Sequence, residues 1–275
     1  MKTKPMLAHK INEEKIDWSQ VVYMQPKLDG VRCIITKDGA FSRAGNKFKN
    51  VAHIEKSLKA FFKQKPKMIL DGELYNHELR NDFEKIISLV RKQKPSKKDV
   101  ANAKKMIQYH VYDYVSSDEY GIRESNLACS DIYNEHIKYV PTKRVKNMTR
   151  ARVQHNKFLD KGYEGSIMRL NKPYANKRSW NLMKFKDFHD AEATITGYEQ
   201  GQGKRKGTIG KFLMTDDEGV EFGCPPGKGY TYKDLAKILK NIHDYIGQRA
   251  TFTYFERTKA GSYRHPLFKG LRNYE

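Results

Sequence analysis

A lysine that could act as a nucleophile lies near the N-terminus, in the segment Lys27-Leu28-Asp29-Gly30-Val31-Arg32. Taken alone, a Lys-x-Asp-Gly sequence is only a turn. A lysine amine attacks phosphorus only when it is unprotonated, so a nucleophilic Lys27 needs partial burial, a bound metal or cationic neighbours that favour the neutral amine. The same positive groups would hold a phosphate in place.

Further segments with chemically useful side chains follow in one order along the chain. They are Asp71-Gly72-Glu73-Leu74-Tyr75, Tyr112-Asp113-Tyr114, Glu164-Gly165-Ser166-Ile167-Met168-Arg169 and Lys184-Phe185-Lys186. Lys184 and Lys186 alternate around Phe185, so in a strand both would project from one face while Phe185 enters the core. Two lysines on one face would form a clamp for phosphate.

The apolar pattern indicates which elements must position these side chains. Residues 21–43 are typical of a strand, a turn and a second strand, which places Lys27 beside the turn. Further elements are expected as strands at 68–70, 109–112 and 166–168, as helices at 83–90 and around 132–137, and as a basic loop at 91–98. This mixture predicts an α+β domain.

The pattern of expected elements changes after about residue 190. Short strands are expected around 194–196, 211–221 and 251–255, and a single helix is expected over 232–245. Such a run suits a small β-barrel of the OB type, which commonly carries nucleic acid on its open face. The boundary between the two domains is expected near Phe188.

Together the motifs resemble the series found in covalent nucleotidyltransferases. Over its whole length, from Lys4-Pro5-Met6-Leu7-Ala8 through residues 186–195 to the C-terminus, the chain is similar to compact viral or phage ATP-dependent DNA ligases. The resemblance implies an adenylyltransferase (nucleotidyltransferase, ATP-grasp-like) domain over residues 1–188 and a C-terminal OB-fold β-barrel over residues 189–275. It also implies ATP, Mg²⁺ or Mn²⁺ as a metal, and a covalent AMP on Lys27.

The resemblance assigns roles to individual residues. The catalytic residues would be Lys27, Asp29, Lys184 and Lys186. Asp29 would orient the lysine and the metal, and Glu164 would hold the metal through its oxygens. The ATP-binding residues would be Gln25, Lys27, Arg32, Arg43, Glu73, Tyr112, Glu164, Lys184 and Lys186.

Within that set each side chain suits its task. Glu73 would accept from the ribose hydroxyls, Tyr112 would stack on the adenine, and Gln25 would read the edge of the base. Arg32 and Arg43 would grip the ribose or phosphates of ATP, and both are also expected to contact DNA.

Two basic segments of the second domain are expected to contact anions. Lys204, Arg205 and Lys206 lie in a Gly-rich loop, 201–207, which we expect to become ordered on the DNA backbone. That loop is short where some viral ligases carry a long clamp-forming hairpin. By resemblance, Arg264, Lys269 and Arg272 would contact the pyrophosphate of ATP after the second domain moves about a hinge at 187–192.

Composition supports a polyanionic partner. The chain has 53 Lys and Arg against 32 Asp and Glu, a net charge of +21, and the excess is spread along the chain. The expected partner is nicked duplex DNA, and the expected state is a soluble intracellular monomer, in the host cytoplasm if the source is a virus or phage. No membrane span, secretory signal, zinc-ligand spacing or P-loop is expected from the sequence.

Three alternatives remain open from sequence. An mRNA capping guanylyltransferase and an RNA ligase can share the Lys-x-Asp-Gly core, and nucleotide and strand choice would separate them. A catalytically silent nucleic-acid-binding module would explain the charge and the barrel but not the order of Lys27, Glu73, Glu164 and Lys186.

Overall fold

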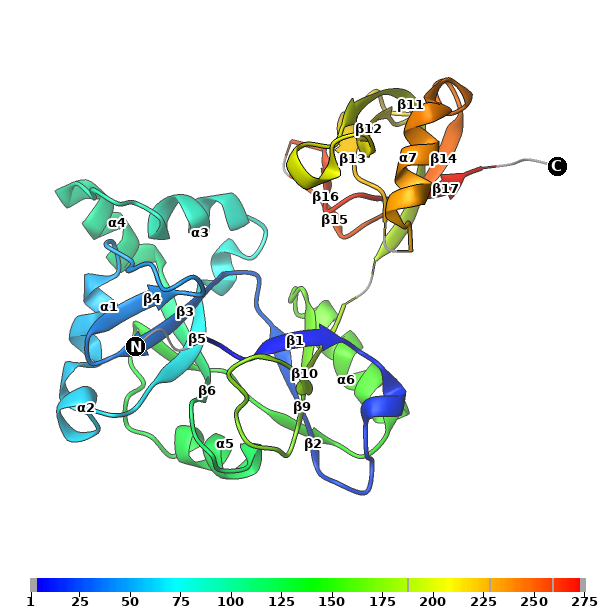
Figure 1. Cartoon of the computed structure of the whole chain (residues 1–275). Coiled ribbons are helices and arrows are strands. Elements are labelled where there is room, and N and C mark those ends of the chain that lie inside the picture. Colours follow the sequence, from blue (N-terminus) through cyan, green and yellow to red (C-terminus); the bar gives the residue numbers. More distant parts are fainter. Residues whose placement is uncertain (1–3, 187, 228, 259, 273–275) are drawn as a thin grey trace. The chain divides into compact units, whose positions relative to one another are not determined.

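The computed structural model describes residues 4–186, 188–227, 229–258 and 260–272, and the chain divides into two compact units, 1–186 and 187–275 (Figure 1). The expected hinge at 187–192 includes Asp187, which lies outside the described residues. None of the helices in the described part of the chain is long and apolar enough to cross a membrane.

The first unit contains two five-stranded sheets. One sheet has the order β1-β10-β9-β2-β8, and its strands are β1 (Leu7–Lys10), β10 (Arg178–Phe185), β9 (Gly165–Leu170), β2 (Val22–Lys27) and β8 (Lys143–Val145). The other has the order β4-β3-β5-β6-β7, and its strands are β4 (Gly39–Ser42), β3 (Val31–Thr36), β5 (Leu70–Tyr75), β6 (Gln108–Tyr114) and β7 (Ile137–Tyr139). β2 and β3 belong to different sheets, so the turn after Lys27 connects the two sheets.

Helices cover both sheets of the first unit. They are α1 (Ala52–Ser57), α2 (Lys59–Gln64), α3 (Phe83–Val90), α4 (Lys97–Met106), α5 (Tyr120–Ala128) and α6 (Met148–Asp160). In Figure 1, α6 lies beside β9 and β10, and α3 and α4 lie together against the other sheet. The larger apolar core lies between that second sheet and its helices, and a smaller core lies between the first sheet and α6.

The second unit is a five-stranded barrel with the strand order β13-β12-β11-β14-β17. Its strands are β11 (His189–Gln200), β12 (Ile209–Thr215), β13 (Glu221–Cys224), β14 (Arg249–Tyr254) and β17 (Leu267–Leu271). An isolated bridge joins Pro226, two residues after the end of β13, to Phe268 of β17, which closes the barrel. A short hairpin of β15 (Glu256–Arg257) and β16 (Tyr263–Arg264) precedes β17, and α7 (Tyr232–Lys240) lies between β13 and β14. This is the predicted small β-barrel with a single α-helix.

Several predicted elements differ from the structure. The helix expected around 132–137 is wrong: the side chain of Asn134 accepts hydrogen bonds from the backbone amides of His136 and Ile137, which makes a turn, and Ile137 then begins β7. The expected loop 91–98 is wrong for its last two residues, because Ser96 and Asp99 form a capping box that starts α4 at Lys97. The helix expected over 232–245 ends at Lys240, and a 3₁₀ turn, Ile242–Asp244, follows. The helix expected at 83–90 is confirmed as α3.

Candidate active site

A pocket of about 280 Å³ opens in the first unit where the two sheets meet. It is lined by Leu7, Ala8, Gln25, Pro26, Lys27, Leu28, Arg32, Arg43, Glu73, Tyr112, Ile167, Arg169, Arg178, Leu182 and Lys184. These residues come from both sheets and from segments far apart in the sequence. Seven of the fifteen residues are charged and six of these are cations, which suits a ligand that carries negative charge.

The backbone brings Lys27, Glu164 and the end of β10 together at one edge of this pocket. Lys27 ends β2 and pairs with Gly165, the first residue of β9, and the amide of Glu164 donates to the carbonyl of Lys27 at 3.2 Å. Gly165 has φ +149°, and a Cβ there would lie 2.5 Å from the carbonyl oxygen of Phe185. Only glycine permits this approach. Gly165 therefore allows Lys27, at the end of β2, and Lys186, just after β10, to lie on either side of Glu164.

One buried carboxylate connects two of these lysines. Glu164 forms an ion pair with Lys27 and accepts from Nζ of Lys186 at 2.8 Å. Burial would raise the pKa of Glu164, but attraction from Lys27 and Lys186 outweighs it and lowers the pKa. Burial, and then repulsion from Lys186 and Lys27, lowers the pKa of Lys184. This edge of the pocket is therefore a cationic cluster around the carboxylate of Glu164.

Glu73 and Tyr112 form another part of the site. The Tyr112 hydroxyl donates to Oε2 of Glu73 at 3.3 Å. Burial raises the pKa of Glu73 to about 8, although Lys27 and Arg32 act in the opposite direction. Arg32 pairs with Glu73 across β3 and β5, and its guanidinium binds Asp71 through two hydrogen bonds of 2.9 and 2.5 Å. Arg32 lines the pocket, and a buried carboxylate that does not line it holds the guanidinium in place.

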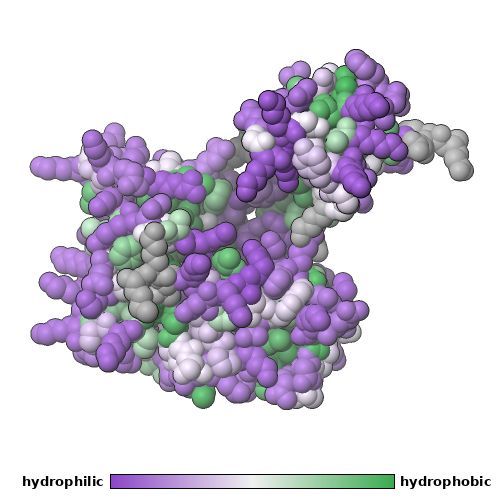
Figure 2. Space-filling model, viewed as in Figure 1, coloured by the Kyte–Doolittle hydropathy of each residue, from purple (hydrophilic) through white to green (hydrophobic). Residues whose placement is uncertain are grey.

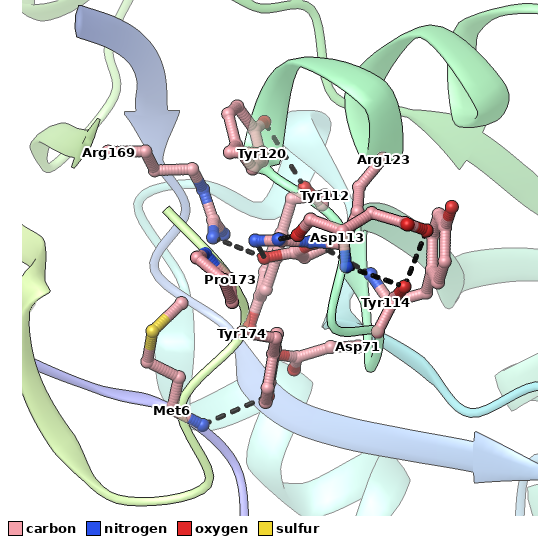
Figure 3. A network of polar contacts seen from close by, with 12 residues as sticks. Met6, Asp71, Tyr112, Asp113, Tyr114, Tyr120, Arg123, Arg169, Pro173 and Tyr174 are labelled. Carbon is pink, nitrogen blue, oxygen red and sulfur yellow. Dashed lines mark hydrogen bonds and ion pairs between the residues drawn. The ribbon is translucent and has the colours of Figure 1, made fainter. Parts of the chain in front are cut away.

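A buried ionic network centred on Asp113 includes the pocket residues Arg169 and Tyr112 (Figure 3). Asp113 binds Arg123 at 2.7 and 3.2 Å and Arg169 at 2.6 Å, and Nε of Arg169 donates to the amide oxygen of Gln25 at 2.7 Å. The guanidinium of Arg169 also lies 5.4 Å from the ring centroid of Tyr112. The network therefore fixes Gln25 and Tyr112 relative to each other.

The predicted base-reading residue is already engaged by the protein. Nε2 of Gln25 lies within hydrogen-bond distance of the carbonyl oxygens of Tyr112 and Val140 and of the Thr142 hydroxyl. The side chain is 2% exposed although it lines the pocket. Base reading by Gln25 stays a prediction. Because Nε2 already has protein acceptors, the base would have to donate a hydrogen bond to the remaining lone pair of the amide oxygen.

The remaining predicted residues lie in different surroundings. Arg43 is an exposed residue of the pocket lining and forms no hydrogen bond or ion pair with the described residues. Asp29 is half-buried outside the lining, close enough to Tyr75 to help raise the pKa of that tyrosine after burial and Tyr163. Lys186 and Glu164 lie next to the lining residues Lys27 and Lys184, at the same edge.

In the second unit the expected pyrophosphate ligands are all in ion pairs with that unit's own carboxylates. Lys269 binds Asp190 at 2.8 Å, and Arg272 and Arg264 bind Glu192 and Glu256. Lys204, Arg205 and Lys206 are exposed, but the loop that carries them is folded into a 3₁₀ turn, Gly203–Arg205. The expected contact of this loop with the DNA backbone, and its ordering there, stay predictions.

Sequence reasoning missed two arginines of the pocket. Arg169 ends a quoted motif and follows Ile167 by two residues in one strand, so alternation could have placed it on the same face. Arg178 lines the pocket and donates to the carbonyl of Ala8. No simple pattern predicted Arg178, because the pairing of β1 with β10 shifts register between Ala8 and His9.

The site offers few carboxylates for the expected metal. The described residues contain no group of three or more His, Cys, Asp or Glu side chains that could hold a metal ion. Mg²⁺ commonly keeps several waters and binds through one or two carboxylates and the phosphates of the substrate. Glu164, beside Lys27, fits that kind of site and does not fit a cage made by protein alone.

Comparison with known proteins identifies both units. The model of the ATP dependent DNA ligase domain matches residues 5–186, and the model of the DNA ligase OB-like domain matches residues 200–272. A DNA ligase of Haemophilus influenzae is 24% identical over 271 residues, which cover 96% of this chain and 90% of that protein. The DNA ligase of Enterobacteria phage T4 is 24% identical over 88% of this chain, and the match spans 62% of the phage protein.

Solved structures agree with the fold. A structure described as "DNA binding with a minimal scaffold: Structure-function analysis of Lig E DNA ligases" has a TM-score of 0.79 at 24% identity and covers 98% of this chain and 99% of its own. Chlorella virus DNA ligase-adenylate has a TM-score of 0.52 at 25% identity, with 98% and 99% covered. With its pocket of lysines and carboxylates in the first unit and its barrel in the second, this chain belongs to the family of ATP-dependent DNA ligases.

Proposed function

We propose that the protein seals nicks between a 3′-hydroxyl and a 5′-phosphate in duplex DNA through an AMP bound covalently to Lys27. The observation that carries this proposal is the position of the Lys27 amine. It lies at the edge of a nucleotide-sized pocket, in contact with Glu164, with Lys184 and Lys186 beside it. Family membership supports the reaction class, and the relatives, which are DNA ligases, support DNA as the substrate.

In the first step ATP binds with its base against Tyr112 and its ribose hydroxyls near Glu73. The apolar side chains of Ile167 and Leu182 also line this pocket and exclude water from the base. Ionised Glu73 accepts hydrogen bonds from the ribose. Burial raises the pKa of this carboxyl to about 8, and the hydrogen bonds that the ribose hydroxyls donate act in the opposite direction and favour its charged form.

The amine of Lys27 then attacks the α-phosphorus. A new N–P bond forms, the bond to the bridging oxygen breaks, pyrophosphate leaves, and the amine loses a proton. Lys184 and Lys186 stabilise the negative charge that develops on the phosphate oxygens. Glu164 would help to hold Mg²⁺, and the bound ion would supply further positive charge for the phosphate oxygens.

Two further transfers complete the cycle. An oxygen of the 5′-phosphate of the nick attacks the AMP phosphorus, which releases Lys27 and leaves a DNA-adenylate. The 3′-hydroxyl then attacks the 5′-phosphate, AMP leaves and a phosphodiester forms. All three displacements occur at phosphorus, so one cluster of lysines can serve each of them.

A sealing assay tests this proposal. A duplex with one fluorescent strand and a single nick is incubated with the protein, Mg²⁺ and ATP, and the product is measured on a denaturing gel. We expect sealing by the natural protein and at least a thousandfold less by the Lys27→Ala variant. Sealing with GTP alone, or of a nick in RNA alone, would contradict the proposal and favour a capping enzyme or an RNA ligase.

A further inference from the structure

The second unit carries its cations in two kinds of surroundings. Around the barrel, several lysines and arginines are neutralised by carboxylates: Lys269 by Asp190, Arg272 by Glu192, Arg264 by Glu256, Arg257 by Asp216, and Arg249 by Asp217. Six other cations are exposed and form no ion pair with the described residues. They are Lys204, Arg205 and Lys206 in the turn between β11 and β12, and Lys233, Lys237 and Lys240 in α7.

The three lysines of α7 share one helical face. Lys233, Lys237 and Lys240 are spaced by four and three residues, which aligns them along a helix. Leu235 and Ile238, which pack into the barrel core, occupy the buried side. The nearby carboxylate, Asp234, is bound by the backbone amide and hydroxyl of Thr231 in a capping box. The row of charges is therefore left available for an outside partner.

Tyr232 joins this helix to the basic turn. It is 56% exposed, and its hydroxyl donates to the backbone carbonyl of Lys206 at 2.7 Å. The turn is also closed from within, because the buried Thr208 donates its hydroxyl to the carbonyl of Arg205 at 2.7 Å and its carbonyl accepts from Gly201 at 2.9 Å. An ordered turn loses less conformational entropy on binding than a disordered one.

Hydrophilic side chains dominate the visible face of both units (Figure 2), so hydrophilic character alone does not single out a surface. What distinguishes these six described cations is that none of them is paired with a carboxylate. The other described lysines and arginines of the barrel are paired with carboxylates. Exposed unpaired cations in a row match the repeating charge of a DNA backbone, and they give affinity without reading sequence.

We propose that the turn 203–206 and the exposed face of α7 form one docking surface for the backbone of duplex DNA, with Tyr232 as its brace. We call it the turn–helix surface, and its side chains are Lys204, Arg205, Lys206, Tyr232, Lys233, Lys237 and Lys240. Tyr232 is a positioning residue that acts through the turn. The choice of DNA as the partner rests on the proposed function, whereas the existence of the surface does not.

The helix half of the surface is tested by charge removal in the full chain. The Lys233→Gln/Lys237→Gln/Lys240→Gln variant is compared with Lys59→Gln/Lys63→Gln/Lys67→Gln, which removes the same charge from exposed positions of the first unit. Fluorescence polarisation measures binding to a nicked duplex with a 3′-dideoxy end, which cannot be sealed, over a range of salt concentrations. Circular dichroism confirms that both variants fold.

We expect the α7 variant to bind at least tenfold more weakly and the control to change less than threefold. Each lost phosphate contact lowers the slope of log affinity against log salt by about 0.9, so loss of three contacts lowers it by about 2.7 for the α7 variant. Equal losses in the two variants, or no loss in either, would overturn the proposal.

The brace is tested by a double-mutant cycle. Tyr232→Phe removes only the hydroxyl, and it is made both in the natural chain and in a chain with serines at 204, 205 and 206. We expect three- to tenfold weaker DNA binding in the natural chain and no further loss in the serine background. An equal loss in both backgrounds, or none in the natural chain, would overturn the positioning role.

Self-adenylation separates this inference from the proposed function. We expect every variant of the turn–helix surface to form the AMP adduct at the natural rate, since none of these side chains belongs to the pocket of the first unit. If the natural chain formed no adduct, the proposed function would fail, and the polarisation data would still decide whether the surface binds DNA.

Discussion

Glu73 shows how one residue of the pocket depends on its burial. Burial raises its pKa to about 8, whereas in the unfolded chain it titrates near 4.5. The folded state therefore holds one more proton between these two pH values, and its stability falls as pH rises by at most about 1.4 kcal/mol per pH unit. Its stabilising contribution is complete below about pH 4.5 and is lost as pH passes through 8.

The Glu73→Gln variant removes this titration. Urea unfolding at pH 5, 6, 7 and 8 should give a difference in stability, variant minus natural chain, that grows steadily in favour of the variant. Both tryptophans, Trp18 and Trp180, lie in the first unit, so their fluorescence follows the unfolding of that unit alone. A difference independent of pH would show that Glu73 titrates normally.

The resemblance of the ordered motifs to those of nucleotidyltransferases was sufficient to name Lys27, Glu73, Tyr112, Glu164 and Lys184 as candidates. The structure brings all five to one pocket or its edge. Partners were not predictable. Glu164 forms ion pairs with two lysines, and Arg169 donates a hydrogen bond to Gln25. These contacts join residues far apart in the chain, so the sequence pattern does not reveal them.

The carboxylate of Asp113, in β6, connects four elements. It binds Arg123 of α5 and Arg169 of β9, and Arg169 in turn binds Gln25 of β2. Asp113 and the two arginines it binds, Arg123 and Arg169, are each at most 2% exposed. Removing one partner of a buried ion pair leaves an uncompensated charge, which costs about 3–5 kcal/mol. In Asp113→Asn two arginines lose their counter-ion at once.

We expect Asp113→Asn to destabilise the first unit by at least about 3 kcal/mol, measured by urea unfolding with tryptophan fluorescence. Glu135→Gln makes the same change of charge on a side chain that is 81% exposed, and it should stay within about 0.5 kcal/mol of the natural chain. Similar stabilities for the two variants would mean that the network contributes little.

Helices and strands were predicted correctly where the apolar periodicity of the sequence was strong. They were predicted wrongly where contacts between distant residues determine the structure. The periodic apolar residues of α3 were sufficient to predict its bounds. Residues 132–137 have apolar residues at a helical spacing, yet Asn134 makes a turn and β7 then pairs with β6 in parallel. The turn after Lys27 was predicted, but its role as the link between two sheets was not, because pairing with β9 and β5 is non-local.

For the whole molecule, the net charge of +21 predicts strongly salt-dependent DNA binding. A protein that makes 6–10 phosphate contacts loses about 10³–10⁵ in affinity between 50 and 200 mM salt. We expect a loss in this range for a nicked duplex, measured by fluorescence polarisation. A loss below tenfold would mean that backbone contacts do not dominate binding.

The central claim is that Lys27 carries AMP between ATP and DNA, and intact-mass measurement tests it most directly. The purified chain and its Lys27→Ala variant are incubated with Mg²⁺ and ATP or GTP, and nicked duplex DNA is then added. The account predicts the mass of one AMP on the natural chain only, with ATP only, and its loss when the nick is added. An adduct on the variant, a GMP adduct, or no adduct with either nucleotide on chain freed of bound AMP would contradict it.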